Sequence, residues 1–507
     1  MMKGMKEPRK LAVWMLAAAI GAAAVVPGYA SAAQAAAPTK QASAEAMDTA
    51  VREAMKQLAD QGVLSGYENG SLRPNQPVTR AEAAKLLVLA LGLKPAGQAG
   101  STAGLDAAEH NGKWYVPYVN TALSNGLFEI KDGKFRPNEP VTEGELAAMA
   151  AKALQRDNLS LSTWLSSVAD GKANATRGET SRLLVKAEQS VRSANASIVS
   201  VRAIDGIALE VTMTGPMTQS DETIEKSAET FKFDGGLTIV NQPRLKTGSV
   251  NQYIVPVTKM EEGRAYKLTY KGEQVVTFTG TGELIRFNDA RQVTNDTFEV
   301  EALLADGVVD YGYVISAYAG GRGKDAIVLE EGNRHNGQPL QIISSLRNRT
   351  AVLTPEGGEP IRVSYVGYTQ STDGKQEPKF RLPAGTVLQQ GVRYTVSADW
   401  FTVKQPSFVA SQIAPLTIAS AKQTDAKTLT VTLAQDPGDE LFAFRSVTLE
   451  GSDGSKLTAQ YRVQTRQGAT GIFDLQNGVE LKDSVAYSVK PVGAWAVTSG
   501  EVTLASK

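Results

Sequence analysis

The chain has 507 residues, 53 basic and 53 acidic side chains, 46 glycines and no cysteine. This length exceeds one ordinary domain, because domains usually hold about 100–200 residues. The lack of cysteine excludes a disulfide framework, a thiolate metal site and a cysteine nucleophile, and the two histidines, His110 and His335, leave little room for imidazole chemistry. The even charge balance argues against a nucleic-acid binder with a basic surface.

Residues 1–32 have the features of a secretory signal peptide. Basic residues precede an uncharged apolar run from Leu11 to Val26, and the small residues Ala30, Ser31 and Ala32 follow it. A membrane anchor is the alternative, but the run is shorter than the roughly 20 residues that cross a bilayer. We therefore predict that the protein is secreted and has no membrane span after removal of the signal.

A helical unit with a conspicuous loop follows the signal segment. Apolar residues from Met47 to Leu58 recur at helical spacing, and Gly62 ends this pattern. The loop from Gly66 to Asn75 contains an Asn-Gly turn signal. Thr79 and Glu82 then form a predicted capping box, in which each side chain satisfies a free amide at the start of a second helix.

The same unit recurs twice along the chain. The second copy has a helix at 114–123, a loop at 131–138 and a capping box 63 positions after the first. The third copy is shorter and lacks the glycine-rich loop. The capping pairs are Thr79 and Glu82, Thr142 and Glu145, and Thr176 and Glu179. Internal repetition is therefore the main organisational signal of the chain.

These repeats resemble the S-layer homology (SLH) family of bacterial wall-anchoring modules. The resemblance rests on Gly-Tyr-x-(Asn/Asp)-Gly-x-(Leu/Phe)-Arg-Pro-Asn followed by Val-Thr-Arg-Ala-Glu. It covers residues 45–94 as repeat 1, 105–156 as repeat 2 and 157–192 as a degenerate repeat 3. The resemblance implies an all-α, pseudo-threefold helical bundle whose grooves bind secondary cell-wall polysaccharide through a pyruvylated sugar. It also implies a place on the cell wall or S-layer of Gram-positive or related bacteria.

Two roles are predicted within the five-residue motif. The threonines and glutamates are explained as helix caps, each contributing about 1 kcal/mol. Arg80 and Arg177 stand at the first helical position, where a cation opposes the helix dipole. An anionic ligand held by the arginine fork and free helix-start amides would explain this placement, and a solvated arginine paired with an acid is the alternative. Repeat 2 has Glu143 and Gly144 there, so we expect its pocket to be silent or altered.

Residues of the loops and first helices complete the candidate site. Arg73 and Arg136 end the loops, where they could line a groove or brace the turn. Tyr67 and Trp114 could stack on a sugar face, although Trp114 fits a helical core equally well. The predicted carbohydrate-binding set is Arg80, Arg177, Arg73, Arg136, Tyr67 and Trp114, and no catalytic or metal-ligating residue is predicted.

After Asn195 apolar and polar residues alternate, which is typical of strands, and short runs of this kind separated by turn residues predict all-β sandwiches. A strand centred on Tyr266, Tyr394 or Tyr487 recurs late in each presumed module, and a pair of opening strands recurs early in each. We predict modules at 196–282, 283–414 and 415–507, the middle one with long loops around 320–323 and 372–374. The pattern resembles bacterial Ig-like repeats.

The predicted function is structural: an S-layer or envelope protein, anchored through SLH repeats, whose β modules self-assemble laterally into a two-dimensional lattice. An SLH-anchored adhesin or spacer is the alternative, and a wall-displayed glycan hydrolase with an unrecognised carboxylate pair is a less favoured one. We predict no enzymatic activity, because His335 lies in a polar turn and no nucleophile or phosphate-loop motif is present. Calcium is retained as a candidate cofactor for assembly, although no segment has the ligand spacing of a calcium loop.

Overall fold

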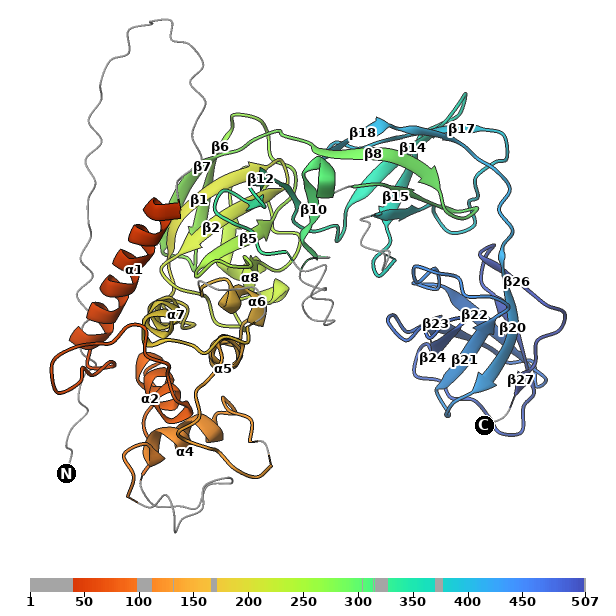
Figure 1. The fold of residues 1–507 in the computed structure, drawn as a ribbon. Helices are drawn as coiled ribbons and strands as arrows, with labels where there is room; N and C mark the ends of the chain where they lie inside the picture. The colour runs from red at the N-terminus through yellow and green to blue at the C-terminus, as the bar shows by residue number, and fades with distance from the viewer. Residues whose placement is uncertain are drawn as a thin grey trace, which may run out of the picture. The chain divides into compact units, whose positions relative to one another are not determined.

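The computed structural model describes residues 40–97, 112–130, 132–165, 171–302, 304–312, 314, 327–369 and 377–505. The predicted signal peptide, His110 and the loops at 320–323 and 372–374 lie outside these ranges. Helices occupy the N-terminal part of the described chain (Figure 1). They are α1 (Lys40–Asp60), α2 (Arg80–Ala90), α4 (Val116–Ser124), α5 (Glu143–Leu154), α6 (Asn158–Ser162) and α7 (Arg177–Gln189).

The threonines of the repeated motif define where three of these helices begin. In α2 the Thr79 hydroxyl accepts the Glu82 N–H, and the Glu82 carboxylate accepts the Thr79 N–H at 2.9 Å. Thr142 and Glu145 form the same capping box at α5. At α7 the Thr176 hydroxyl accepts the Glu179 N–H at 3.2 Å. Each cap satisfies an amide that has no partner within its own helix.

A closed ring of three backbone hydrogen bonds joins the repeats. The Val78 N–H donates to the Ala175 carbonyl, the Ala175 N–H to the Val141 carbonyl, and the Val141 N–H to the Val78 carbonyl, each at 2.9 Å. All three residues are fully buried and precede a capping threonine by one position. The pseudo-threefold arrangement expected from the SLH resemblance is therefore present at the backbone level.

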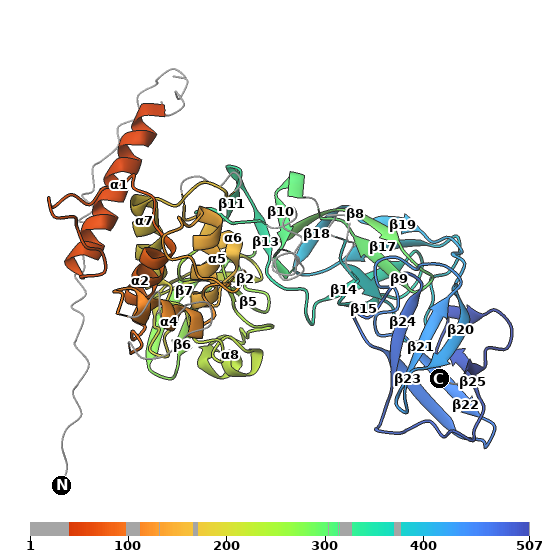
Figure 2. The same ribbon diagram turned by 60° about the horizontal axis from the view of Figure 1, so that its bottom comes forward.

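One apolar core fills the helical unit. Helix α2 packs against α4 and α7, and α5 packs against α6 and α7 (Figure 2). Buried leucine, valine and alanine side chains dominate this core, with Phe135 and Trp164 as its largest fully buried rings. The small alanine side chains allow the helix backbones to pack closely. The helices therefore contact one another through alanines as well as through large side chains.

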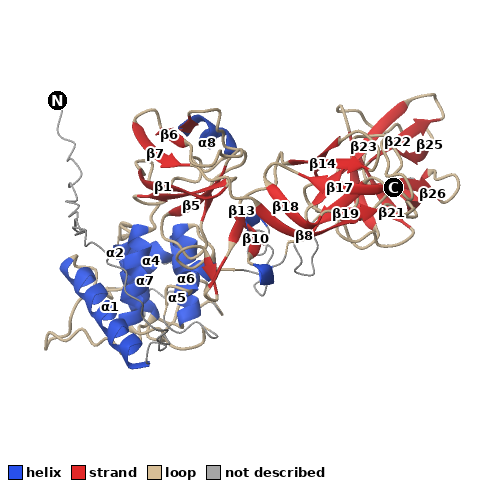
Figure 3. Ribbon diagram, turned by 90° about the horizontal axis from the view of Figure 1, so that it is seen from above, coloured by secondary structure: helices blue, strands red, loops and turns tan. Residues whose placement is uncertain are grey.

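Strands predominate from Ile198 to the C-terminus (Figure 3). In the first β region one sheet has the order β1-β2-β5-β4 and a second has the order β3-β6-β7, with a shared core between them. The elements are β1 (Ile198–Asp205), β2 (Ala208–Met213), α8 (Ile224–Thr230), β3 (Phe231–Phe233), β4 (Arg244–Leu245), β5 (Gln252–Pro256), β6 (Ala265–Tyr270) and β7 (Gln274–Thr279).

The second β region contains a sheet with the order β18-β8-β9-β16-β15-β14-β17-β19. Its elements are β8 (Ile285–Gln292), β9 (Thr297–Val300), β14 (Thr350–Pro355), β15 (Ile361–Tyr365), β16 (Lys379–Arg381), β17 (Arg393–Ser397), β18 (Phe401–Gln405) and β19 (Ser407–Val409). Shorter elements lie between β9 and β14: η1 (Leu304–Asp306), β10 (Val308–Asp310), β11 (Arg334–His335), β12 (Gln338–Pro339) and β13 (Gln341–Ile343). This intervening segment has its own small core, which includes Ile254 of β5.

The third β region has the strand order β25-β22-β23-β24-β21-β20-β26, and β27 also pairs with β20. Its strands are β20 (Leu416–Gln423), β21 (Thr428–Leu433), β22 (Ser446–Gly451), β23 (Lys456–Tyr461), β24 (Thr470–Leu475), β25 (Tyr487–Pro491), β26 (Ala496–Thr498) and β27 (Leu504–Ala505). A separate core cluster lies within it. The predicted fold class, a helical unit followed by β modules, is confirmed.

The recurring tyrosines have one structural role in all three β regions. Tyr266, Tyr394 and Tyr487 are buried, and each hydroxyl accepts the backbone N–H of the residue five positions upstream. These distances are 3.0, 2.9 and 3.2 Å. Such a hydrogen bond is the tyrosine corner found in Ig-like sandwiches. It explains why the sequence repeats this residue late in each module.

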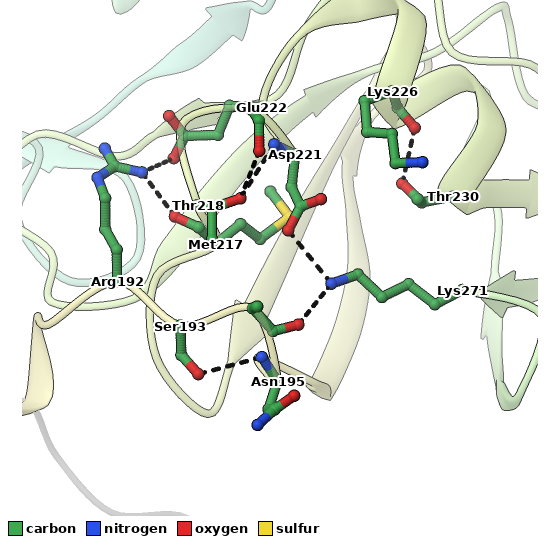
Figure 4. A network of polar contacts seen from close by, with 12 residues as sticks. Arg192, Ser193, Asn195, Met217, Thr218, Asp221, Glu222, Lys226, Thr230 and Lys271 are labelled. Atoms are coloured by element: carbon green, nitrogen blue, oxygen red, sulfur yellow. Dashed lines mark hydrogen bonds and ion pairs between the residues drawn. The ribbon is translucent and has the colours of Figure 1, made fainter.

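Polar contacts connect the end of the helical unit to the first β region. Arg192 donates to the Glu222 carboxylate at 2.5 Å, and Lys271 donates to the Asp221 carboxylate at 3.2 Å and to the Ala194 carbonyl at 2.8 Å (Figure 4). Charged hydrogen bonds therefore hold the segment after α7, where the spacing of apolar residues changes from helical to alternating.

Repeat 3 contacts the first β region through the short helix α6. The Trp164 indole N–H donates to the Gly248 carbonyl at 2.9 Å, and the Gly248 N–H donates to the Ser160 hydroxyl at 2.7 Å. Arg156, the last residue of repeat 2, also donates to the Val250 carbonyl at 3.2 Å. The degenerate repeat and the residue before it thus supply a junction with the β region.

Replacing a capping threonine tests the origin of the helix starts. We expect Thr142→Ala to lower the free energy of unfolding of the helical unit by about 1 kcal/mol, because the Glu145 amide loses its acceptor. Thr142→Ser keeps the hydroxyl and should stay within a few tenths of a kcal/mol of the parent. Calorimetry and hydrogen exchange at the first turn of α5 provide the measurement. Equal stability of the alanine and serine variants would contradict this explanation.

Candidate functional site

A groove of about 210 Å³ brings together residues from all three repeats. Ser65 and Tyr67 come from the loop after α1, and Lys85 lies on α2. Trp114 precedes α4, and Arg177 begins α7. The groove therefore contains three of the six residues predicted to bind carbohydrate, together with a lysine outside that set.

Arg177 is buried and braces the loop of repeat 1. Its side chain is only 6% exposed. Its Nε donates to the Leu72 carbonyl at 2.9 Å, and Nη2 donates to the Ser65 carbonyl at 2.7 Å. Nη1 lies 3.8 Å from the Glu82 carboxylate. The guanidinium thus holds together the two ends of the loop that forms one wall of the groove.

Arg80 makes the equivalent contacts with the loop of repeat 2. Its Nε donates to the Phe135 carbonyl at 2.7 Å, and Nη2 donates to the Glu129 carbonyl at 3.2 Å. Nη1 lies 3.9 Å from the Glu145 carboxylate. Burial lowers the pKa of the Arg80 guanidinium, which nevertheless stays charged in a protein. Both motif arginines therefore act across a repeat boundary on the neighbouring loop.

The helix-start amides are engaged, contrary to the expectation that they are free. The Arg80 and Ala81 N–H groups donate to the carbonyls of Glu139 and Pro137 at 2.8 and 3.0 Å. At α7 the first two N–H groups donate to the carbonyls of Gln76 and Pro74 at 2.9 and 2.8 Å, and at α5 to those of Ala173 and Gly171 at 2.9 and 3.0 Å. Carbonyls of an adjacent repeat thus occupy the positions at which an anion was expected.

Glu143 occupies the position in repeat 2 that corresponds to Arg80 and Arg177. It is buried at the start of α5. Its carboxylate cannot donate to loop carbonyls as an arginine does, because an ionised carboxylate only accepts hydrogen bonds. The three helix starts are therefore related in their backbone hydrogen bonds but differ in their side-chain chemistry.

The arginines that end the loops are involved in local contacts. The Arg73 guanidinium carbon lies 3.8 Å from the centre of the Tyr67 ring, which is a cation–π contact. Arg136 pairs with Asp132 at 3.0 Å and lies 3.8 Å from the Glu139 carboxylate. Both arginines have left-handed backbone conformations, with φ of 46° and 56°. These observations favour the turn-bracing alternative for Arg73 and Arg136.

Trp114 and Lys85 line the groove together, Trp114 as an exposed and Lys85 as a half-buried residue. The Trp114 side chain is 53% exposed and lies before α4 rather than in the helical core. The Lys85 Nζ lies 6.0 Å from the Trp114 ring centre and 3.5 Å from the Ser65 hydroxyl. Sequence reasoning missed Lys85, although its place three residues after Glu82 puts both on one face of α2.

The described residues show two further negative findings. Within them, no helix is long and apolar enough to cross a membrane. Among the same residues, no group of three or more histidine, aspartate or glutamate side chains is placed to hold a metal ion. Calcium dependence therefore stays a prediction.

Comparison with known proteins identifies the helical unit. The family model of the S-layer homology domain matches residues 46–84 and 106–147. A surface layer protein of Brevibacillus choshinensis is 30% identical over 109 residues, which are 21% of this chain and 10% of that protein. The surface-layer 125 kDa protein of Lysinibacillus sphaericus is 32% identical over 106 residues, 20% of this chain and 8% of that protein. The S-layer homology match therefore falls within the helical unit, on the first two repeats.

The alignments cover about a tenth or less of the length of these relatives. An amylopullulanase of Thermoanaerobacterium thermosulfurigenes is 23% identical over 169 residues, 30% of this chain and 9% of the enzyme. The two surface-layer proteins have the higher identity over their aligned residues, 30% and 32%. The family model and these relatives support a location at the cell surface.

Removing the Arg177 side chain tests its bracing role. Arg177→Ala leaves the part-buried carbonyls of Leu72 and Ser65 without this charged donor, so we expect the free energy of unfolding to fall by about 2–3 kcal/mol. Arg73→Ala, which removes a cation–π contact on the same loop, should cost about 1 kcal/mol or less. Chemical denaturation of the two variants measures the difference. A smaller loss for Arg177→Ala than for Arg73→Ala would refute the bracing role.

Proposed function

We propose that this chain is a structural protein of the bacterial envelope, anchored non-covalently through its SLH repeats to secondary cell-wall polysaccharide. The observation that carries the proposal is the groove shared by three repeats, in which Trp114 is exposed beside Lys85. An aromatic face suits a pyranose ring, and a cation next to it suits a carboxylate on that ring. A pyruvylated sugar combines both features.

The β regions have features suited to lateral association. Strand β19 is the last strand of its sheet and carries Val409, which is 51% exposed. Strands β1 and β7 also end their sheets, but they lie against each other, and the Gln274 side chain accepts the Ile198 N–H at 2.7 Å. An edge strand offers unpaired backbone groups to another chain. The β19 edge therefore supports the proposal that wall-anchored copies assemble into a two-dimensional lattice. An SLH-anchored adhesin or spacer is the alternative that uses the same anchor.

Sedimentation with purified cell walls tests the anchor. We expect the chain without residues 1–32 to bind walls and to lose most of this binding when pyruvyl ketals have been removed by mild acid, because the cation and the aromatic ring then lack their carboxylate-bearing partner. Walls treated in parallel at neutral pH are the control. Undiminished binding to depyruvylated walls would contradict the proposed ligand.

Electron microscopy of the purified chain tests lateral assembly. We expect ordered arrays on wall fragments, with and without added Ca²⁺, and fewer arrays for Val409→Lys, because a charge on an edge strand opposes pairing. Val387→Lys, at an exposed position outside the strands, is the matched control. Persistent monomers under all conditions would favour the adhesin or spacer. Glycan hydrolysis that disappeared on changing one acidic residue would overturn the structural assignment.

A further inference from the structure

We infer that Lys85, rather than either motif arginine, contacts the anionic group of the wall ligand, and that Arg177 is a positioning residue. This inference rests on the proposed function and assigns roles within its groove. Lys85, on the second turn of α2, thus binds the anionic group of the ligand. The buried Arg177 holds the loop that forms one wall of the groove.

Arg177 has little capacity left for a ligand. Two of its three nitrogens donate to carbonyls of the repeat 1 loop, at 2.9 and 2.7 Å, and the third faces the Glu82 carboxylate. A second anion would have to approach a buried guanidinium past this carboxylate. Charge repulsion and lost hydrogen bonds both oppose such an approach.

Lys85 has the opposite properties. Its Nζ contacts the neutral Ser65 hydroxyl at 3.5 Å and lies 6.0 Å from the Trp114 ring centre. In the part of the chain that the structure describes, no carboxylate lies within ion-pair distance of this ammonium group. A lysine has three donors and a flexible stem, so it can reach a carboxylate on a sugar stacked against Trp114.

The corresponding positions of the other repeats differ from Lys85. In repeat 2 the residue 63 positions later is Ala148, and Ile130 likewise replaces Tyr67. In repeat 3 the residue three positions after the motif glutamate is Arg182, whose Nη1 pairs with Glu179 at 3.2 Å. The groove beside the repeat 1 loop, here called the groove of repeat 1, therefore has a cation, Lys85, next to the exposed ring of Trp114. We infer that this groove is the principal anion receptor of the unit.

The shared chemistry of the ligand is an anionic group on a pyranose. A pyruvyl ketal, a uronic acid and a sugar phosphate all provide it. In each of them the acidic group lies outside the ring and leaves a ring face free for stacking on Trp114, and the pyruvyl ketal is the source that the proposed function names. Titration with a pyruvylated hexosamine, its pyruvate methyl ester, glucuronic acid and a hexose 6-phosphate distinguishes these sources.

The test compares lysine variants of the chain without residues 1–32. We expect Lys85→Ala to weaken binding of the pyruvylated sugar more than tenfold and to flatten its salt dependence, because a charge contact is lost. Lys85→Arg should retain affinity within about threefold, since it keeps a cation at the same site. Lys152→Ala removes an exposed lysine that pairs with Glu129 near the repeat 2 loop, and it should bind as the parent does.

Arg177→Lys separates positioning from contact. It keeps a charge but cannot make both loop hydrogen bonds, so we expect lower stability and weaker binding with an unchanged salt dependence. Failure of the parent chain to bind any of the four sugars would defeat the proposed function itself. If the parent binds, two results overturn the inference: equal affinity of Lys85→Ala and the parent, or a salt dependence that flattens in Arg177→Lys but not in Lys85→Ala.

Discussion

The helical unit depends on the ring of hydrogen bonds between Val78, Val141 and Ala175 and on the loop carbonyls that surround it. Each segment of the ring leads directly into a capped helix, so the ring fixes three helix starts at once. The amides of those helix starts then donate to a neighbouring repeat. Buried polar backbone groups must be paired, which makes the three repeats mutually dependent rather than three independent modules.

The groove forms because these hydrogen bonds bring the three repeats together. Because α7 begins beside the loop of repeat 1, Arg177 can hold that loop from another repeat, and Trp114 closes the groove from a third. The motif arginine is thus explained by its contacts within the protein. Its place against the helix dipole costs little compared with the part-buried loop carbonyls that it satisfies. In the proposed function, contact with the ligand falls to Lys85 and Trp114.

Much of this architecture could be predicted from local sequence. The capping pairs and the recurring tyrosines make hydrogen bonds to residues close by in the sequence, and the 63-residue spacing repeats the same local pattern. The sequence alone therefore predicts these features. The state of the helix-start amides could not be predicted, because their acceptors lie in other repeats and become neighbours only through the ring. Lys85 was missed for a related reason: it resembles any solvated helix lysine until Trp114 is brought beside it. The small core around Ile254 was likewise hidden, since it joins residues from distant parts of the chain.

In the proposed function, the groove of repeat 1 receives a charged sugar of the cell wall. A crystal structure of the chain with a pyruvylated hexosamine would show the sugar in place. We predict electron density for a pyranose against the Trp114 ring, with its carboxylate in hydrogen-bond contact with the Lys85 ammonium group and Arg177 still bound to the loop. A sugar seated elsewhere in the helical unit, or a carboxylate paired with Arg177 in place of the loop carbonyls, would contradict it.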